Sequence, residues 1–268
     1  MTINTNLEAL NSANNLDAAQ TRLDQSLERL SSGLKINSPS DDPAGLAAAS
    51  RINAEAQATT AAQNNVGGAL SFTQTQDGYL SGISTALTQM SQLSVEALND
   101  TQSDSDRSLY DLEFQQLNSY IVSTAAKDFD GVSLFSGNSI NIPLDADGVV
   151  TLSMNGIDLT AGAYADVTSS NIATTTAAAT AMAAVDAAIT QLASDRATLG
   201  SYETRLNFAS DQLSVGEQNL TAASSQIEDV NVADESTEYA RDNVLLQSTT
   251  AMLAQANQLP QTVLKLIS

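Results

Sequence analysis

Residues 243–268 read NVLLQSTTAMLAQANQLPQTVLKLIS, and this stretch decides the kind of fold to expect. Apolar or small side chains return in it at alternating steps of four and three residues, the heptad pattern of a helix that packs along another helix. The members of this seam are Leu245, Thr249, Met252, Ala256, Leu259, Val263 and Leu266. Lys265 is the only charged residue of the stretch, although a solvated amphipathic helix normally carries charges on its outer face. We therefore expect this helix to be buried against other chains on several sides.

A second apolar stripe lies at the opposite end of the chain, where helical spacing extends from residue 3 to about residue 34. Its main part consists of Leu16, Leu23, Leu27, Leu30 and Leu34, preceded by a run of Ile3, Leu7 and Leu10, and the register slips near Asn14. Two such stripes predict that the terminal segments pair as an antiparallel or crossed coiled coil. Their burial stabilises the pair by less than the conformational entropy lost on ordering both segments. The pair is thus expected to be mobile in the monomer and ordered by its neighbours. Pro260 indicates either fraying or a fixed kink.

The middle of the chain alternates between helical and strand-like patterns. Residues 44–99, 107–126 and 174–227 have helical spacing, whereas 138–160 contains two alternating apolar runs, typical of a β-hairpin. Asn155-Gly156 is a tight-turn signal within it. The fold class predicted is mainly α: a long antiparallel helical bundle with a small β-hairpin, and N- and C-terminal helices paired as a coiled coil.

Composition excludes several classes of function. The formal net charge is −21, and the ten basic residues are scattered, so neither nucleic acid nor an anionic membrane is an expected partner. The chain has no Cys and no His, which removes thiol nucleophiles and the side chain best suited to proton transfer near neutral pH. No secretory signal peptide is visible at the start. We predict no catalytic residues, no metal site and no cofactor.

Two groups of acidic residues have a catalytic or a metal-binding interpretation as well as a structural one. Asp145, Asp147 and Gly148 resemble the opening of a calcium loop, but the later carboxylate is missing, and a hairpin turn fits better. Asp41 and Asp42 could act as paired carboxylates. They precede Pro43 at a predicted helix start, however, and helix capping fits better.

Three motifs resemble those of one known family, bacterial flagellin. The first is SLERLSSGLKINS at residues 26–38, continued by DDPAGLA at 41–47. The second is FDGVSLFSG at 129–137, and the third is AMLAQANQLPQTVL at 251–264. The resemblance covers both ends of the chain strongly and the helical middle loosely.

The resemblance implies a structural role and a layered organisation. Residues 1–43 and 229–268 would form the inner filament core, and 44–228, with the hairpin at 138–160, the second layer; outer variable domains would be absent. The subunit would be secreted by type III export into the extracellular flagellar filament and used for swimming. Its main partner would be itself, in a helical homopolymer. Further partners would be an export chaperone on the C-terminal helix, the filament cap and hook-junction proteins.

The family is also sensed by a vertebrate Toll-like receptor. The matching contact region here would comprise Gln89, Met90, Leu93 and Glu113, with Met90 where the sensed form carries an Arg. A thioether cannot replace the directed hydrogen bonds of a guanidinium, so weak receptor activation is predicted.

Two alternatives remain open from the sequence. Hook–filament junction proteins share similar terminal helices but are made in few copies. A flagellin-like secreted enzyme would need an insert with a nucleophile or metal ligands, and the short middle segment argues against that reading.

Overall fold

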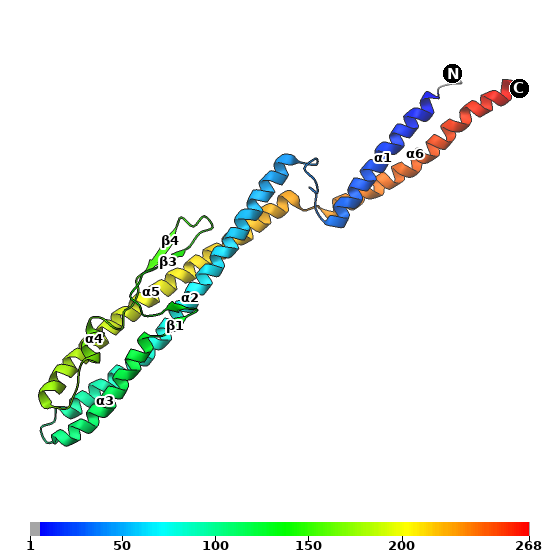
Figure 1. The fold of residues 1–268 in the computed structure, drawn as a ribbon. Coiled ribbons are helices and arrows are strands. Elements are labelled where there is room, and N and C mark those ends of the chain that lie inside the picture. Colours follow the sequence, from blue (N-terminus) through cyan, green and yellow to red (C-terminus); the bar gives the residue numbers. More distant parts are fainter. Residues whose placement is uncertain (1–5, 268) are drawn as a thin grey trace. The chain divides into compact units, whose positions relative to one another are not determined.

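The computed structural model describes the backbone of residues 6–267 and the side chains of residues 6–258. Helices dominate, and the strands are short and antiparallel (Figure 1), so the predicted mainly α class is confirmed. The helices are α1 (Leu7–Ser32), α2 (Pro43–Ala97), α3 (Asp104–Ala125), α4 (Ala163–Thr168), α5 (Thr175–Glu228) and α6 (Val232–Ile267). The strands are β1 (Asp128–Phe129), β2 (Val132–Ser133), β3 (Ile140–Pro143) and β4 (Thr151–Met154).

The chain packs as two compact units. One unit comprises residues 1–56 and 218–268, and the other comprises residues 57–217. We call them the terminal unit and the central unit. The backbone leaves the helical conformation between Ser32 and Pro43 and between Glu228 and Val232. The compact units extend past these breaks into the ends of α2 and α5.

The central unit is built on two long antiparallel helices with a shorter third one. Parts of α2 and α5 run side by side, and α3 packs with them (Figure 1). Small and aliphatic side chains fill the core, which allows close helix packing along its length. Fully buried examples are Val66, Leu80, Ile83, Leu87, Phe114, Ile121, Val185, Ala188 and Leu206. At the surface, Arg196 forms a two-pronged ion pair with Asp77, joining α5 to α2.

Helix boundaries follow local capping chemistry. At the start of α2, Asp42 Oδ1 accepts hydrogen bonds from the backbone N–H groups of Ala44 and Gly45, at 3.1 and 2.9 Å. Asp41 instead accepts from the backbone of Ser38 and Asn37, and these bonds lower the pKa of its carboxyl. Both carboxylates are therefore engaged with backbone donors, as the capping interpretation predicts.

The prediction for residues 44–99 allowed one or two helices, and the structure has one. α2 continues without interruption through the glycines at positions 67, 68 and 78. Glycine costs about 1 kcal/mol per site in a helix interior, and the packing of α2 against the core offsets this cost. The sequence reading missed α4 and the β1–β2 pair.

The predicted β-hairpin is present as β3 and β4. Ile142 pairs with Leu152, and Ile140 with Met154. Its turn lies at Asp145–Gly148, where Asp145 Oδ2 accepts from the backbone of Val150 at 2.9 Å and Gly148 has a φ of 68°. The turn interpretation of this acidic stretch is therefore confirmed.

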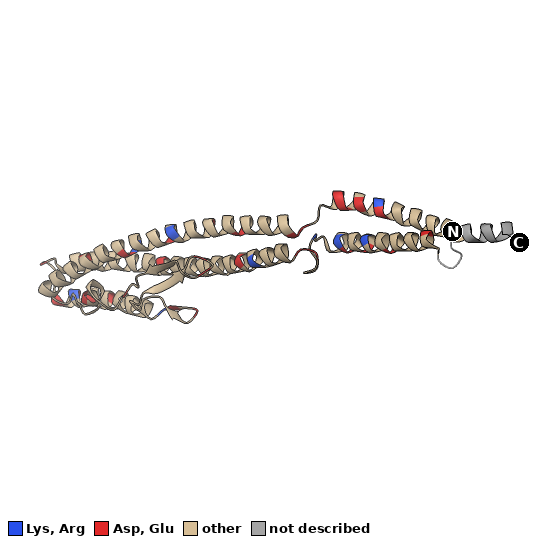
Figure 2. Cartoon of the chain, turned by 90° about the horizontal axis from the view of Figure 1, so that it is seen from above, with Lys and Arg blue, Asp and Glu red and all other residues tan. Residues whose placement is uncertain are grey.

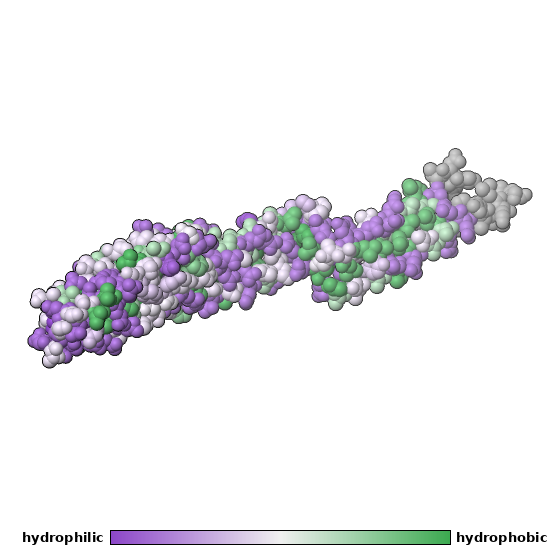
Figure 3. Space-filling view, turned by 60° about the horizontal axis from the view of Figure 1, so that its bottom comes forward, coloured by the Kyte–Doolittle hydropathy of each residue, from purple (hydrophilic) through white to green (hydrophobic). Residues whose placement is uncertain are grey.

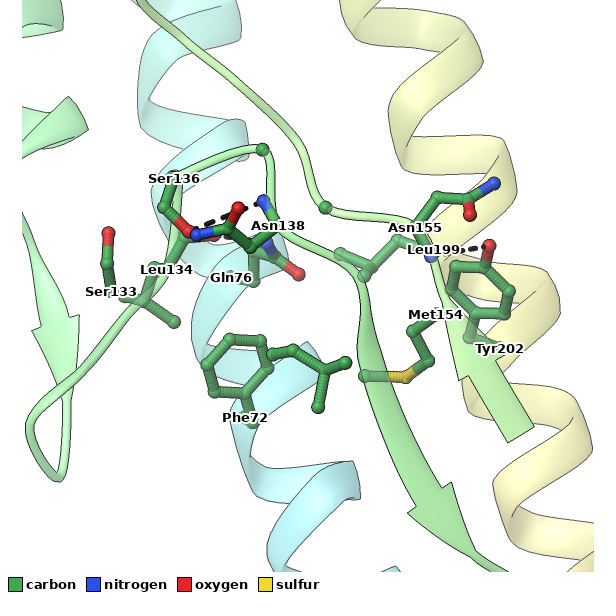
Figure 4. A pocket seen from close by; sticks show the side chains of 13 residues that line it. Phe72, Gln76, Ser133, Leu134, Ser136, Asn138, Met154, Asn155, Leu199 and Tyr202 are labelled. Atoms are coloured by element: carbon green, nitrogen blue, oxygen red, sulfur yellow. Dashed lines mark hydrogen bonds between the residues drawn. The ribbon is translucent and has the colours of Figure 1, made fainter. Parts of the chain in front are cut away.

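Asn155-Gly156 is not a hairpin turn, contrary to the sequence reading. Gly156 follows β4, and a Cβ at this position would collide with backbone atoms of Gly137 and Asn138. The glycine is needed for this close backbone approach rather than for a turn. Figure 4 shows the surrounding site, where the backbone N–H of Asn155 donates to the Tyr202 hydroxyl at 3.1 Å. Gln76 of α2 donates to the carbonyl of Leu134 at 2.6 Å, so polar contacts attach this region to both long helices.

We predict that Gly156→Ala destabilises the central unit by about 1–3 kcal/mol, because the methyl group forces apart two backbone segments. Gly200→Ala is the matched control: a Cβ there meets nothing within 4 Å, and the helix should gain about 0.5–1 kcal/mol. Urea unfolding of the full chain measures both. Equal stability of the two variants would show that the approach at Gly156 is not constrained.

Candidate assembly surface

The terminal helices α1 and α6 pair in an antiparallel coil held by contacts at both ends. Near the C-terminal end of α1, Ser26 Oγ donates to Glu235 Oε1 at 2.6 Å, and Arg29 lies 3.8 Å from the same carboxylate. At the other end, Asn6 Nδ2 donates to the carbonyl of Ala256 at 2.8 Å. The antiparallel form of the predicted coiled coil is thus the one observed.

Charge fixes the register of this pair. Arg22 and Arg29 lie seven residues apart on α1, and they meet Asp242 and Glu235, seven apart on α6. The helices are antiparallel, so moving seven residues back along α1, from Arg29 to Arg22, corresponds to moving seven residues forward along α6, from Glu235 to Asp242. Figure 2 shows charged residues near the beginning of α6, and residues 243–258 after Asp242 carry no charge. Ion pairs of this exposure add little stability, but a shifted register would leave buried Asp242 without its partner.

The seam alternates between small or polar side chains, which are buried, and leucines, which are half-buried. The fully buried positions are Ala19, Ser26, Asp242 and Ala256. Leu246, Thr249 and Leu253 of α6 are half-buried between them in heptad register. Small residues let the two helix backbones approach closely, but they bury little apolar area, so the pair alone is weakly stabilised.

The predicted seam residues of α6 differ in how far they are buried against α1. Thr249 and Ala256 face α1, whereas Leu245 and Met252 point outward, with 39% and 60% of their surface exposed. The side chains of Leu259, Val263 and Leu266 lie outside the described residues. On α1, Leu16, Leu23, Leu30 and Leu34 are half-buried, but Leu7, Leu10 and Leu27 are exposed. The signal for the true seam was the heptad spacing of Arg22 and Arg29 against Glu235 and Asp242.

Large apolar side chains consequently remain on the surface of the terminal unit. Leu7 and Leu10 are 65% and 59% exposed, and the outward face of α6 carries further examples. These are Val232, Val244, Leu245 and Met252. Figure 3 shows hydrophobic side chains running along the part of the surface that the terminal helices form. We call this exposed set, together with Leu27, the assembly surface; exposed large apolar side chains gathered on one unit mark a candidate interaction site.

The four residues predicted as a receptor contact are divided between surface and core. Gln89 and Glu113 are exposed, but Met90 is fully buried and Leu93 nearly so. Of the four, only Gln89 and Glu113 are therefore accessible on the surface of this chain. Helical spacing alone did not reveal that residue 90 faces the core.

The described residues contain no group of three or more Asp, Glu, His or Cys that could hold a metal ion. Among those same residues, no helix is both long enough and apolar enough to cross a membrane.

Comparison with known proteins agrees with this geometry. Residues 3–139 match the bacterial flagellin N-terminal helical region, and residues 182–267 match the bacterial flagellin C-terminal helical region. Flagellins of Halalkalibacterium halodurans and Bacillus subtilis are 33% and 34% identical to this chain, with all of each chain covered. Flagellin FlaB2 of Treponema pallidum is 32% identical over the same extent.

Solved structures show the same fold. The crystal structure of Bacillus cereus flagellin superposes with a TM-score of 0.52 at 30% identity, covering 56% of this chain and 88% of that one. A putative flagellar hook-associated protein from Vibrio parahaemolyticus gives a TM-score of 0.62 over 70% of this chain and all of that one. Its 18% identity makes it a likeness of fold alone.

An antiparallel terminal coil that exposes its largest apolar residues defines a self-assembling structural protein. The chain belongs to the bacterial flagellin family, and it is a structural subunit that polymerises into a flagellar filament.

We predict that Ala19→Leu destabilises the pairing of α1 with α6 by about 1–3 kcal/mol, because the seam has no room for three more carbon atoms. Ala18→Leu adds the same group to the exposed neighbouring position and should leave the pair intact. Hydrogen exchange of α1 and α6 in dilute full-length protein, with trimethylamine oxide added to favour burial, compares the two. Equal protection in both variants would contradict the seam assignment.

Proposed function

We propose that the assembly surface is where each copy is packed by its neighbours in the filament. Leu7, Leu10 and Leu27 of α1, with Leu245 and Met252 of α6, would be buried against other copies. The half-buried leucines of the seam, Leu16, Leu23, Leu30 and Leu34, would complete the same layer, together with Leu259, Val263 and Leu266. The observation that carries this proposal is the exposure of the large side chains in a coil whose fully buried seam residues are small or polar.

The physical reason for polymerisation is the incomplete burial of the terminal unit. Around Leu245 and Met252, the surface of α6 between residues 243 and 258 consists of uncharged polar and small side chains. Uncharged polar groups can form hydrogen bonds across a protein interface, whereas unpaired charges are costly to bury there. Neighbouring copies can therefore cover this helix on several sides and supply the apolar burial that the pair lacks.

The layered organisation follows from the same argument. The terminal helices, residues 1–43 and 229–268, form the inner core, and residues 44–228 form the layer around it. The backbone breaks between α1 and α2 and between α5 and α6 fall at these boundaries, which supports the assignment. Within the terminal unit, Lys35 N–H donates to the carbonyl of Glu228, and Val230 N–H donates to that of Gly33, so the two connections are joined to each other.

Export of the subunit and the two ends of the filament each imply further partners. The subunit is secreted through the type III apparatus of the flagellum, and a chaperone covers the apolar face of α6 until then. The filament cap and the hook-junction proteins bind at the two ends of the filament. A role as a junction protein is the second candidate, supported by the likeness in fold to the hook-associated protein. A secreted enzyme is the third, and the described part of the chain has no group of three or more Asp, Glu, His or Cys that could hold a catalytic metal ion.

Leu10→Gln and Met252→Gln should each raise the critical concentration for polymerisation about ten- to hundred-fold, because each removes about 1.5–3 kcal/mol of apolar burial at a contact. Leu10→Met and Met252→Leu keep the apolar volume and should polymerise like the wild type. Sedimentation of seeded filaments measures the concentration of free subunit. Normal polymerisation of both Gln variants would contradict the proposed surface. Failure of the wild type to form long filaments would instead favour the junction protein.

Receptor activation by this chain is expected to be weak, because exposed Gln89 and Glu113 leave the region without a guanidinium. Gln89→Arg should strengthen the response of cells carrying the Toll-like receptor, whereas Thr88→Arg, at the exposed position before it, should not. A wild-type response equal to that of a stimulatory flagellin would refute the expectation.

A further inference from the structure

Phe208 is the most exposed aromatic side chain in the described part of the chain. It lies on α5 with 69% of its surface accessible, in a protein whose other phenylalanines are buried or half-buried. Val215, seven residues further along α5 and 57% exposed, continues the same helix face. Arg205 is exposed one turn before Phe208, and the described residues provide no ion-pair partner for it. The central unit thus presents an aromatic side chain next to a free positive charge.

An apolar groove opens elsewhere on the same unit. It lies between α2, the β1–β2 pair and the hairpin, and has a volume of about 470 Å³. Its lining is mostly hydrophobic and includes Ala69, Phe72, Phe129, Val132, Ile140 and Met154. Val132 is 50% exposed at the groove, and Asp130, which also lines it, is an exposed acid. The groove is large enough for an aromatic ring, and no described side chain of the same copy fills it.

The two features are complementary in chemistry: one is an exposed aromatic ring beside a positive charge, and the other is an apolar groove beside a negative charge. An open, head-to-tail polymer needs two different patches on each copy, one of which fits the other. Buried aromatic side chains in pockets supply much of the energy of protein interfaces. A ring in the groove would bring Arg205, one helical turn away, towards Asp130 at the same site. The protein has a net charge of −21, so its copies repel each other. An attractive pair of opposite charges at the contact would partly offset this repulsion.

From this complementarity we infer that Phe208 of one copy inserts into the groove beside Val132 of a neighbouring copy in the filament. The inference rests on the proposed polymerisation, but it concerns the central unit and not the assembly surface. It identifies a specific contact in the layer formed by residues 44–228, and the partner in this contact is a second copy of this chain. Arg205 of the first copy then pairs with Asp130 of the second.

Disulfide cross-linking tests this contact directly, because the natural chain has no cysteine. Differently tagged Phe208→Cys and Val132→Cys chains are copolymerised, oxidised, and separated under denaturing, non-reducing conditions. A mixed dimer should form in filaments and be absent from the dilute monomers. Leu109→Cys, at a 64% exposed position on α3, replaces Phe208→Cys in the matched control and should yield none. A missing dimer, or an equal yield with Leu109→Cys, would overturn the inference.

A second measurement covers the case in which the cysteine chains fail to assemble. Phe208→Ser should raise the critical concentration at least about ten-fold with an unchanged circular dichroism spectrum of the monomer, whereas Phe208→Tyr should stay near the wild-type value. Unchanged polymerisation of Phe208→Ser disproves the contact. Failure of the wild type to polymerise would instead count against the proposed function on which the contact rests.

Discussion

The structure of the terminal unit depends on the seam between α1 and α6, which leaves several large apolar side chains of both helices exposed to solvent. Ala19, Ser26 and Ala256 let α1 and α6 approach closely, and the Arg22–Asp242 and Arg29–Glu235 pairs set their register. Small residues contribute little burial, and exposed ion pairs contribute little free energy. Leu7, Leu10, Leu27, Leu245 and Met252 remain exposed on the outside of the coil. A subunit of this design has a defined pairing and an unsatisfied surface, which is what polymerisation requires.

The central unit, in contrast, has a complete hydrophobic core of its own. Its long helices bury a continuous aliphatic core, and the hairpin is attached to α2 and α5 through the contacts around Gln76 and Tyr202. A unit that completes its own core can keep its shape before and after assembly. Large side chains also remain exposed on it, among them Leu109, Leu112 and Phe208. Phe208 lies near a free Arg205, and an apolar groove lies open on the same unit.

Most of the helices and the hairpin could be read from the sequence, but which helix face is buried could not. The α6 seam was predicted along Leu245 and Met252, since leucine and methionine are the usual seam residues. In the structure Leu246 and Leu253 face α1 instead, in heptad register with buried Asp242, which pairs with Arg22. Asn155-Gly156 was misread for a similar reason: the glycine serves a close approach to Gly137 and Asn138, which are distant in sequence and invisible to a local turn rule.

The sequence by itself determined the long helices and the hairpin, the apolar and nearly uncharged character of residues 243–268, and the family, because periodicity, capping residues and long motifs are local properties of the chain. Only the tertiary structure decided which side chains those elements hide. Met90 and Phe208 occupy equally helical stretches, yet one is buried and the other exposed. Burial depends on the partner that each helix face meets, and that partner is set by packing between residues far apart in the chain.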